Sequence, residues 1–329
     1  MADPVSLAVR QGTPGAERAV PLAPGDAAAP SYVGLPEGRW MEVGDVRTWY
    51  ADSGTGTGAP IVLVHGGHAG SPFSFGSWDW ARCFPGLSAG HRVIAVDRLA
   101  QGATGNPVVP TSYTMQASVD HLVQFLEVLD AGPVHLVGHS RGGYVTARAA
   151  LERQDLVRSL TLVDSSTLAP GVGLNEVYLS RPPRELSREG VRWMYETYAF
   201  DAGKLIPESI EACWGATASV KYQTLLQHFA EANQLAARVM PELARDKGVA
   251  LQWLREGRLQ RPTHIIWGGN DRTARAERGL ELFEVLRRHE RRTAFSMIDK
   301  ASHFPFIEHS AWFAELLCGF VDEVDNAVW

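Results

Sequence analysis

Ser140 stands in a pattern that predicts a nucleophile. It is the central residue of a G-x-S-x-G motif at positions 138–142. The motif follows the apolar run 134–137 and precedes a helical pattern that begins near Gly143. A chain that turns so sharply from strand to helix strains the backbone at the serine, and side chains two residues to either side would collide. The motif therefore predicts a serine hydroxyl at the carboxyl end of a strand, above a helix N-terminus that favours negative charge.

A serine hydroxyl attacks a carbonyl group only when a base removes its proton. His303 is the candidate base because it lies in the loop after the apolar run 293–298, at the same predicted edge of the sheet as Ser140. His309, at the start of a C-terminal helical pattern, is the weaker candidate. The serine and the histidine together predict nucleophilic catalysis.

The histidine in turn needs an acid that holds its tautomer and stabilises its cation. Asp271 follows the run 263–267 and a pair of glycines, which let the loop bring a carboxylate inward. Asp164 ends the run 160–163 and is the rival carboxylate at the same edge. We favour Asp271 because of its glycine-rich turn, since an acid in the position of Asp164 more often caps a helix or pins a loop.

A tetrahedral intermediate carries an oxyanion that needs N–H donors. The backbone N–H of Arg141, at the start of the predicted helix, is one candidate. The second is expected in the loop after the run 61–64, where glycines let the backbone approach a ligand closely. We choose Gly67 there, with His68 as the neighbouring alternative.

The elements around these residues alternate between strand and helix. Helical patterns at 115–129, which Thr114 or Thr111 could cap, and at 143–154 separate several of the strands. This alternation predicts a doubly wound, mostly parallel sheet. The expected strands are 40–43, 46–52, 61–64, 93–96, 134–137, 160–163, 263–267 and 293–298.

Two segments do not follow this alternation of strand and helix. The sequence between Leu168 and Gln260 contains no strong strand pattern. Helices are expected there at 188–200, 220–240 and 249–256. We therefore interpret this segment as an inserted lid. The first thirty residues are rich in Ala, Pro and Gly and read as a flexible arm, with docking on a neighbouring subunit as the alternative.

Taken together, the motifs resemble the α/β-hydrolase superfamily, with the nucleophile, acid and base in the order Ser140, Asp271, His303. The resemblance implies an α/β-hydrolase fold: an eight-stranded, mostly parallel sheet with helices on both faces and a helical lid. We accordingly expect a flexible N-terminal extension at 1–38, a core at 39–167 and 262–329, and a lid at 168–261.

The subfamily is less clear from the residues. The loop 97–107 is similar to loops of meta-cleavage-product hydrolases, which break carbon–carbon bonds, whereas residues 303–305 look more like the ending seen in esterases and epoxide hydrolases. Epoxide hydrolases use an Asp nucleophile, so a serine at 140 favours acyl chemistry. The leading interpretation is a serine hydrolase of esters that works through an acyl-enzyme. The alternatives are carbon–carbon bond hydrolysis, cofactor-free perhydrolysis, and a non-catalytic binder.

Aromatic residues are frequent in the expected lid, and some of them should face the cleft. This favours a small-molecule substrate with an apolar or aromatic group. The substrate-binding candidates are Gly66, His68, Trp193, Trp214 and Phe304.

Composition excludes several other classes of function. A net charge of −6 over 329 residues argues against binding of a nucleic-acid backbone, and no apolar run is long enough for a membrane span. Three widely spaced cysteines predict a reducing cytoplasm. No His, Cys and carboxylate cluster has metal-ligand spacing, so we expect neither a metal nor an organic cofactor. A homodimer is an option that the sequence leaves open.

Overall fold

The computed structural model describes residues 28–54, 56–109, 112–172, 175–176 and 185–327. Its centre is one eight-stranded sheet with the order β1-β2-β4-β3-β5-β6-β7-β8. β1 and β2 form an antiparallel hairpin, β2 pairs antiparallel with β4, and all other neighbours are parallel. The strands are β1 (Gly38–Val43), β2 (Val46–Asp52), β3 (Ile61–Val64), β4 (Val93–Val96), β5 (Val134–His139), β6 (Val157–Val163), β7 (Thr263–Gly268) and β8 (Thr293–Ile298). The predicted fold class is confirmed.

The parallel register brings the functional candidates to one edge of the sheet. Gly138 on β5 pairs with Val64 on β3, and His139 pairs with Val163 on β6. The loops after β3, β5, β6, β7 and β8 therefore leave the sheet at the same edge, as the carboxyl ends of parallel strands do.

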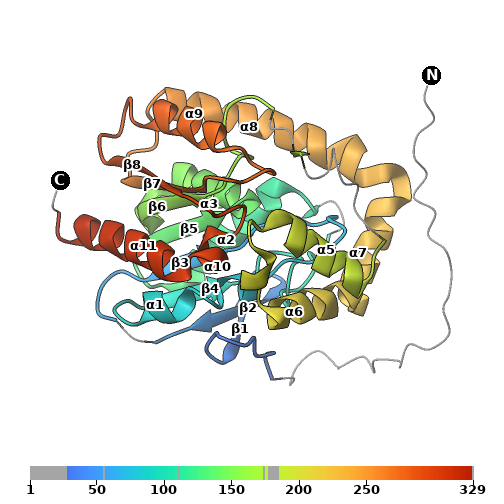
Figure 1. The fold of residues 1–329 in the computed structure, drawn as a ribbon. Helices are drawn as coiled ribbons and strands as arrows, with labels where there is room; N and C mark the ends of the chain where they lie inside the picture. Colours follow the sequence, from blue (N-terminus) through green and yellow to red (C-terminus); the bar gives the residue numbers. More distant parts are fainter. Residues whose placement is uncertain (1–27, 55, 110–111, 173–174, 177–184, 328–329) are drawn as a thin grey trace, which may run out of the picture.

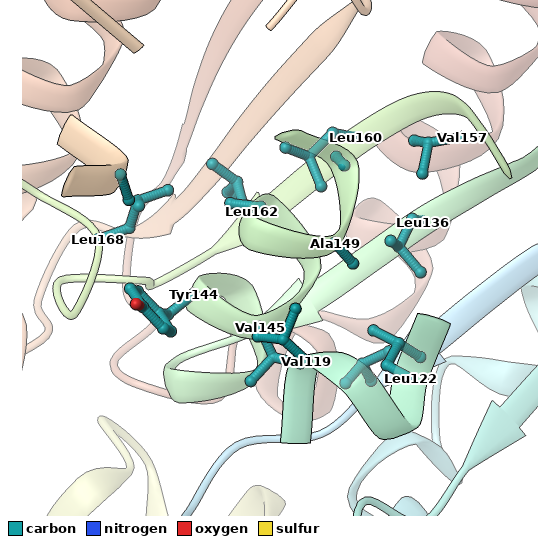
Figure 2. Close-up of a cluster of buried hydrophobic side chains, with 14 of the residues drawn as sticks. Val119, Leu122, Leu136, Tyr144, Val145, Ala149, Val157, Leu160, Leu162 and Leu168 are labelled. Carbon is teal, nitrogen blue, oxygen red and sulfur yellow. The ribbon is translucent and has the colours of Figure 1, made fainter. Parts of the chain in front are cut away.

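Helices cover both faces of the sheet (Figure 1). Because neighbouring residues of a strand point to opposite faces, Val62 and Val64 contribute to one core, and Ile61 and Leu63 to the other. Figure 2 shows the first core, in which Tyr144 and Leu160 take part. The helices outside the inserted segment are α1 (Phe84–Ser88), α2 (Met115–Leu129), α3 (Arg141–Glu152), α9 (Ala276–Leu286), α10 (Pro305–Glu308) and α11 (Ser310–Asp325), with short 3-10 helices η1 (Ser77–Trp80) and η3 (Gln154–Leu156).

The segment between β6 and β7 is helical among its described residues. Its helices α5, α6 and α7 gather beyond one end of the sheet, and α8 runs back beside α9 to β7 (Figure 1). They are α5 (Arg188–Tyr198), α6 (Pro207–Ala218), α7 (Val220–Ala230) and α8 (Met240–Arg255), with short 3-10 helices at Ala202–Lys204 and Glu231–Asn233 and a π-helix at Leu235–Val239 that leads into α8. Across the described residues, each helix is too short or too polar to span a bilayer.

The structure differs from the expected helices at two places in this segment. α6 was not expected, because small residues such as Ala212, Gly215 and Ala216 leave little apolar periodicity. The helix expected at 220–240 is divided, and α8 begins at Met240 with Pro241 in its first turn. Proline is common in that position because it lacks the N–H that would be unpaired there.

The end of the expected N-terminal extension lies against the core. Pro30 accepts a hydrogen bond from Trp49 Nε1 at 2.8 Å, and the Tyr32 ring packs on Trp49 with 4.4 Å between centroids. The Tyr32 hydroxyl donates to Asp97 at 2.8 Å. Tyr32 therefore belongs with the core, while residues 1–27 of the expected extension lie outside the described residues.

Candidate active site

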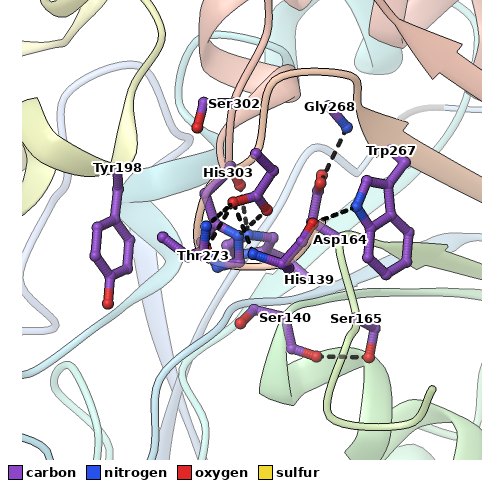
Figure 3. Close-up of polar contacts among 12 residues, drawn as sticks. His139, Ser140, Asp164, Ser165, Tyr198, Trp267, Gly268, Thr273, Ser302 and His303 are labelled. Atoms are coloured by element: carbon purple, nitrogen blue, oxygen red, sulfur yellow. Dashed lines mark hydrogen bonds and ion pairs between the residues drawn. The ribbon is translucent and has the colours of Figure 1, made fainter. Parts of the chain in front are cut away.

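Ser140 occupies the sharp turn between β5 and α3. Its backbone has φ 53° and ψ −120°, a conformation that L-residues rarely adopt. A Cβ at Gly142 would lie 2.3 Å from the carbonyl oxygen of His65, and one at Gly138 would lie 2.3 Å from Thr146 Oγ1. Both positions therefore exclude side chains, as the motif predicts. The Ser140 N–H donates to Val163 at 2.8 Å and its carbonyl accepts from the Ser165 hydroxyl at 2.7 Å, which fixes the turn (Figure 3).

Asp271 and His303 form a buried hydrogen-bonded pair. His303 Nδ1 donates to Asp271 Oδ2 at 2.6 Å. The other oxygen of Asp271 accepts from the backbone N–H of Thr273 at 2.7 Å, from its hydroxyl at 2.7 Å, and from the Ala274 N–H at 3.0 Å. So many donors stabilise a carboxylate anion. Nδ1 is thereby occupied, which leaves Nε2 of His303 as the ring nitrogen that can exchange a proton.

Residues on both sides hold the His303 loop in place. His139, which precedes Ser140, donates from Nε2 to the His303 carbonyl at 2.8 Å. The His303 N–H donates to the carbonyl of Tyr198, and the two rings meet edge to face with 5.5 Å between centroids. The loop of the base is thus joined to the nucleophile strand and to the end of α5. Burial lowers the pKa of His139 well below its usual value, so this ring is neutral.

The glycine loop after β3 lies beside Ser140. A Cβ placed on Gly66 would lie 3.2 Å from the Cβ of Ser140. Gly67 has φ +74°, and a Cβ there would lie 2.2 Å from the Phe75 ring. Glycine is therefore needed at 67 for the backbone conformation and for space.

Arg98 and His65 hold the carbonyls of this loop. The buried Arg98 guanidinium donates to the carbonyls of Gly66 at 3.2 Å, Gly67 at 2.7 Å and His65 at 3.3 Å. His65 Nε2 accepts from the Arg98 N–H at 3.0 Å, so its Nδ1 carries the proton that is shared with the Gly66 carbonyl at 2.8 Å. Burial, with the Arg98 charge, lowers the pKa of His65 to about 3, which agrees with a neutral ring. Because the N–H of a trans peptide points away from its C=O, these bonds turn the Gly67 and His68 N–H groups to the opposite side.

Asp164, the rival acid, lies next to the pair without holding the histidine ring. One of its oxygens accepts from the Gly268 N–H at 2.9 Å. Atoms of Asp164, Asp271 and His303 lie within 4.8 Å of one another, and all three side chains are buried. Within the described residues, this is the one group with metal-like spacing, and two of its three members, Asp271 and His303, already share a hydrogen bond.

The predicted substrate-binding residues have different surroundings. Gly66 and His68 lie in the loop beside Ser140, and His68 Nδ1 donates to the Ala69 carbonyl at 2.7 Å. Phe304 is completely buried between Tyr195 and Tyr198, so its ring packs beside His303 and has no surface to offer a substrate. Trp193 and Trp214 are partly buried and pack against the core that α5 and α6 share with the sheet.

Sequence reasoning missed several residues that support this site. The most connected is Glu308 on α10, whose carboxylate accepts the N–H groups of Ser302, Phe200 and Asp201 at 2.8, 2.7 and 2.9 Å. It joins the base loop to the end of α5. The bond to Thr273 could have been found, because an Asp side chain commonly accepts from the backbone N–H two residues further on.

Comparisons with known proteins agree with this architecture. Residues 61–316 match the model of the alpha/beta hydrolase family, so the chain belongs to that family. It is thus an α/β-fold hydrolase, which confirms the coarse prediction from the sequence.

The chain is similar over most of its length to two hydrolases from bacteria. The chain is 27% identical over 293 residues to a 2-hydroxymuconate semialdehyde hydrolase of Pseudomonas sp. strain CF600, covering 88% of this chain and 95% of the relative. It is 25% identical over 296 residues to a 2-hydroxy-6-oxo-6-(2'-aminophenyl)hexa-2,4-dienoic acid hydrolase of Metapseudomonas resinovorans, covering 86% and 90%.

Solved structures share the fold. A meta-cleavage product hydrolase from Pseudomonas fluorescens IP01 superimposes with a TM-score of 0.69 at 23% identity, covering 88% of this chain and 98% of the other. A putative lipase from Acinetobacter baumannii AYE gives a TM-score of 0.67 at 20% identity, covering 89% and 93%. The fold alone therefore does not distinguish carbon–carbon from ester hydrolysis.

Proposed function

We propose that this protein hydrolyses a carbon–carbon bond in a ring-fission dienoate, with Ser140 as nucleophile, His303 as base and Asp271 as the acid that orients it. The observation that carries the proposal is the near full-length similarity to hydrolases of such compounds, in a chain with an elbow serine and a buried Asp271–His303 pair. The proposal replaces ester hydrolysis as the leading interpretation, because the curated relatives favour the carbon–carbon alternative.

The reaction begins with the attack of Ser140 on the keto carbonyl. Nε2 of His303 takes the hydroxyl proton while Oγ forms a bond to the carbonyl carbon, and the carbonyl π electrons move onto oxygen. Asp271 stabilises the imidazolium through Nδ1 and holds the ring in the required tautomer. The strained backbone at Ser140 keeps the hydroxyl at the exposed end of β5.

The oxyanion needs two N–H donors beside Ser140. We assign them to Arg141, the first residue of α3, and to Gly67 in the glycine loop, with His68 as the neighbouring alternative. The N-terminal turn of a helix favours negative charge, which suits an oxyanion beside Arg141. The bonds from Arg98 to the loop carbonyls keep the second donor turned to the other side.

Collapse of the intermediate breaks the carbon–carbon bond. The electron pair leaves onto the carbon fragment, which can accept it only because a carbonyl group is conjugated with that carbon, and His303 returns its proton there. Water, deprotonated by the same nitrogen, then hydrolyses the acyl-enzyme and releases a carboxylic acid. A 2-hydroxy-6-oxo-dienoate meets this requirement in its keto tautomer, in which the enol proton has moved to the carbon next to the 6-oxo group. The electron pair left on that carbon is then delocalised through the remaining double bond onto the 2-oxo group.

Positive charge near Ser140 suits an anionic substrate. Arg141 is half-buried directly after the nucleophile, and burial together with its charge lowers the pKa of both His68 and Arg98. A carboxylate on the substrate would be attracted to this charge. We assign the helical segment 168–261 as the cap over the site, with Trp193 and Trp214 as candidates for contact with an apolar group of the substrate.

The test compares two substrates on the purified protein. A ring-fission dienone carboxylate and p-nitrophenyl acetate are supplied separately, with Ser140→Ala as the control for both. We expect loss of the dienone chromophore at a kcat/KM well above that for the ester, and loss of turnover in the variant by several orders of magnitude. Hydrolysis of the ester without action on the dienone would contradict the proposal and restore ester hydrolysis.

A further inference from the structure

We propose that Asp164 is a positioning residue for the triad acid: as a neutral carboxylic acid it donates a hydrogen bond to Asp271 and so fixes the carboxylate that holds His303. This inference rests on the proposed function of Asp271 and His303, and it gives a role to the carboxyl group that sequence reasoning treated only as a rival acid.

The position of Asp164 is set by the backbone and is unusual. Asp164 follows β6 directly and has φ 44°, a left-handed conformation that is strained for a residue with a Cβ. Its N–H donates to the Ile266 carbonyl on β7 at 3.1 Å, and its side chain is completely buried. Figure 3 shows it beside Gly268, whose N–H it accepts.

The two oxygens of Asp164 have different surroundings. Oδ1 accepts the Gly268 N–H, whereas no N–H or O–H group of the described residues reaches the buried Oδ2. An ionised carboxylate with such an oxygen would be poorly stabilised, because a buried acceptor without a donor is costly. The acidic neighbour within 4.8 Å is Asp271, which can only accept while it is ionised.

One proton between the carboxyl groups of Asp164 and Asp271 removes the repulsion between two negative charges and gives the buried Oδ2 a hydrogen bond. Asp271 already receives donors on both oxygens, from His303 on one and from Thr273 and Ala274 on the other, so it is the better anion of the two. The proton therefore resides on Asp164, whose Oδ2 then becomes the donor to Asp271. Two adjacent carboxyl groups that share one proton are a known solution to like-charge repulsion.

The electrostatics agree with this assignment. Burial and the charge of Asp271 raise the pKa of Asp164 well above its usual value. The titratable groups that face it are Asp271 after β7, His303 after β8 and Glu308 on α10, whose negative charge acts in the same direction. Ionisation of Asp164 would place a second negative charge beside the triad, which would repel the carboxylate of Asp271 that holds the His303 ring.

The experiment uses three forms of the full-length protein. Asp164→Asn keeps the shape and a neutral donor, since its amide can donate to Asp271 while its oxygen accepts from Gly268. Asp164→Ala removes the donor. We expect Asp164→Asn to retain activity within about threefold, and Asp164→Ala to lose about tenfold to a hundredfold in kcat with little change in KM, the size of one hydrogen bond to a charged group.

Two readouts separate positioning from a merely structural role. The first is the rate at which a fluorophosphonate probe labels Ser140 as a function of pH, which does not depend on the identity of the substrate. If Asp164 is neutral at the active pH, the wild type loses labelling rate at alkaline pH as this group ionises, and Asp164→Asn does not. Absence of labelling in the wild type at every pH would count against the proposed function itself.

The second readout is thermal unfolding. Because the pKa of Asp164 is raised in the folded protein, stability is fully present below its unfolded pKa and is lost as pH rises towards the folded pKa. The Tm of Asp164→Asn should therefore exceed that of the wild type by an amount that grows with pH. The proposal is overturned if Asp164→Asn loses as much activity as Asp164→Ala with no such Tm trend, or if a chelator abolishes wild-type labelling, which would assign the cluster to a bound cation.

Discussion

At the scale of single residues, the site depends on peptide groups as much as on side chains. The Arg98 guanidinium is buried, and its hydrogen bonds go to the carbonyls of the glycine loop. Through those carbonyls it sets the direction of the N–H groups that we assign to the oxyanion. The neutral His65 ring adds a second bond to the Gly66 carbonyl.

Arg98→Met should weaken stabilisation of the oxyanion while the triad stays intact. We expect kcat to fall about a hundredfold, the lower end of the loss for an oxyanion donor, because the peptide that carries the Gly67 N–H is no longer fixed. The change in KM should be small. Steady-state kinetics with the dienone measure both values.

Arg98→Lys is the matched control, because lysine keeps the positive charge but is shorter than arginine, whose Nη1 makes all three bonds to the loop carbonyls. It should recover part of the lost kcat. If Arg98→Met instead raises KM and leaves kcat unchanged, the arginine binds substrate and does not orient the loop.

At the scale of the elements, the base loop is joined to the helical segment that precedes β7. Glu308 on α10 accepts N–H groups from Ser302, beside the base, and from Phe200 and Asp201, after α5. Burial raises the pKa of Glu308, against the effect of these three donors. Movement of the end of α5 would therefore be transmitted to His303, whose own N–H bonds to Tyr198.

Glu308→Ala should remove the hydrogen bonds that hold the base loop at Ser302 and the residues after α5. The buried N–H of Ser302 would be left without an acceptor, and the more exposed N–H groups of Phe200 and Asp201 would lose theirs, so we expect the protein to lose about 1–3 kcal/mol of unfolding free energy. Denaturant unfolding measures this loss.

Glu308→Gln keeps one accepting oxygen and serves as the control, with a loss less than half as large. Fluorophosphonate labelling of Ser140 at low temperature, where both variants are folded, should be slower in Glu308→Ala than in Glu308→Gln. Equal labelling rates in the two variants would show that this carboxylate does not affect the base.

Sequence patterns predicted the regular elements better than their connections. The eight strands were expected within a few residues of their observed bounds, and Thr114 caps α2 by accepting from the Ala117 N–H, as one of two expected caps. Buried aliphatic runs and capping hydroxyls act locally, so they are visible in a sequence. α6 was missed because its small residues leave little apolar periodicity, although it packs against α5 and α7.

In the candidate active site, too, some contacts could be expected from the sequence and others could not. The Asp271–His303 hydrogen bond was expected from two loops on one sheet edge. The pairing of Arg98 with the loop after β3 and the contact of Asp164 with Asp271 were not expected. These depend on loop backbone directions, including the left-handed φ of Asp164, which no local residue pattern specifies.

At the scale of the whole molecule, the sheet forms a rigid support, and the loops at one of its edges carry the residues of the candidate active site. Residues separated by 163 positions, Ser140 and His303, are held on neighbouring loops because β5 and the strands after it run parallel. The net charge is −6, yet Arg98 and Arg141 place positive charge beside the nucleophile. An anionic substrate would thus meet local attraction on a molecule that is negative overall.

The most direct test of the central claim is detection of the covalent intermediate. The protein is mixed with an excess of the ring-fission dienone, quenched in acid within one turnover, digested, and analysed by mass spectrometry. The account predicts an acyl group on the peptide that contains Ser140, no adduct in Ser140→Ala, and a much slower appearance in His303→Ala. Undiminished cleavage of the dienone by Ser140→Ala would contradict it.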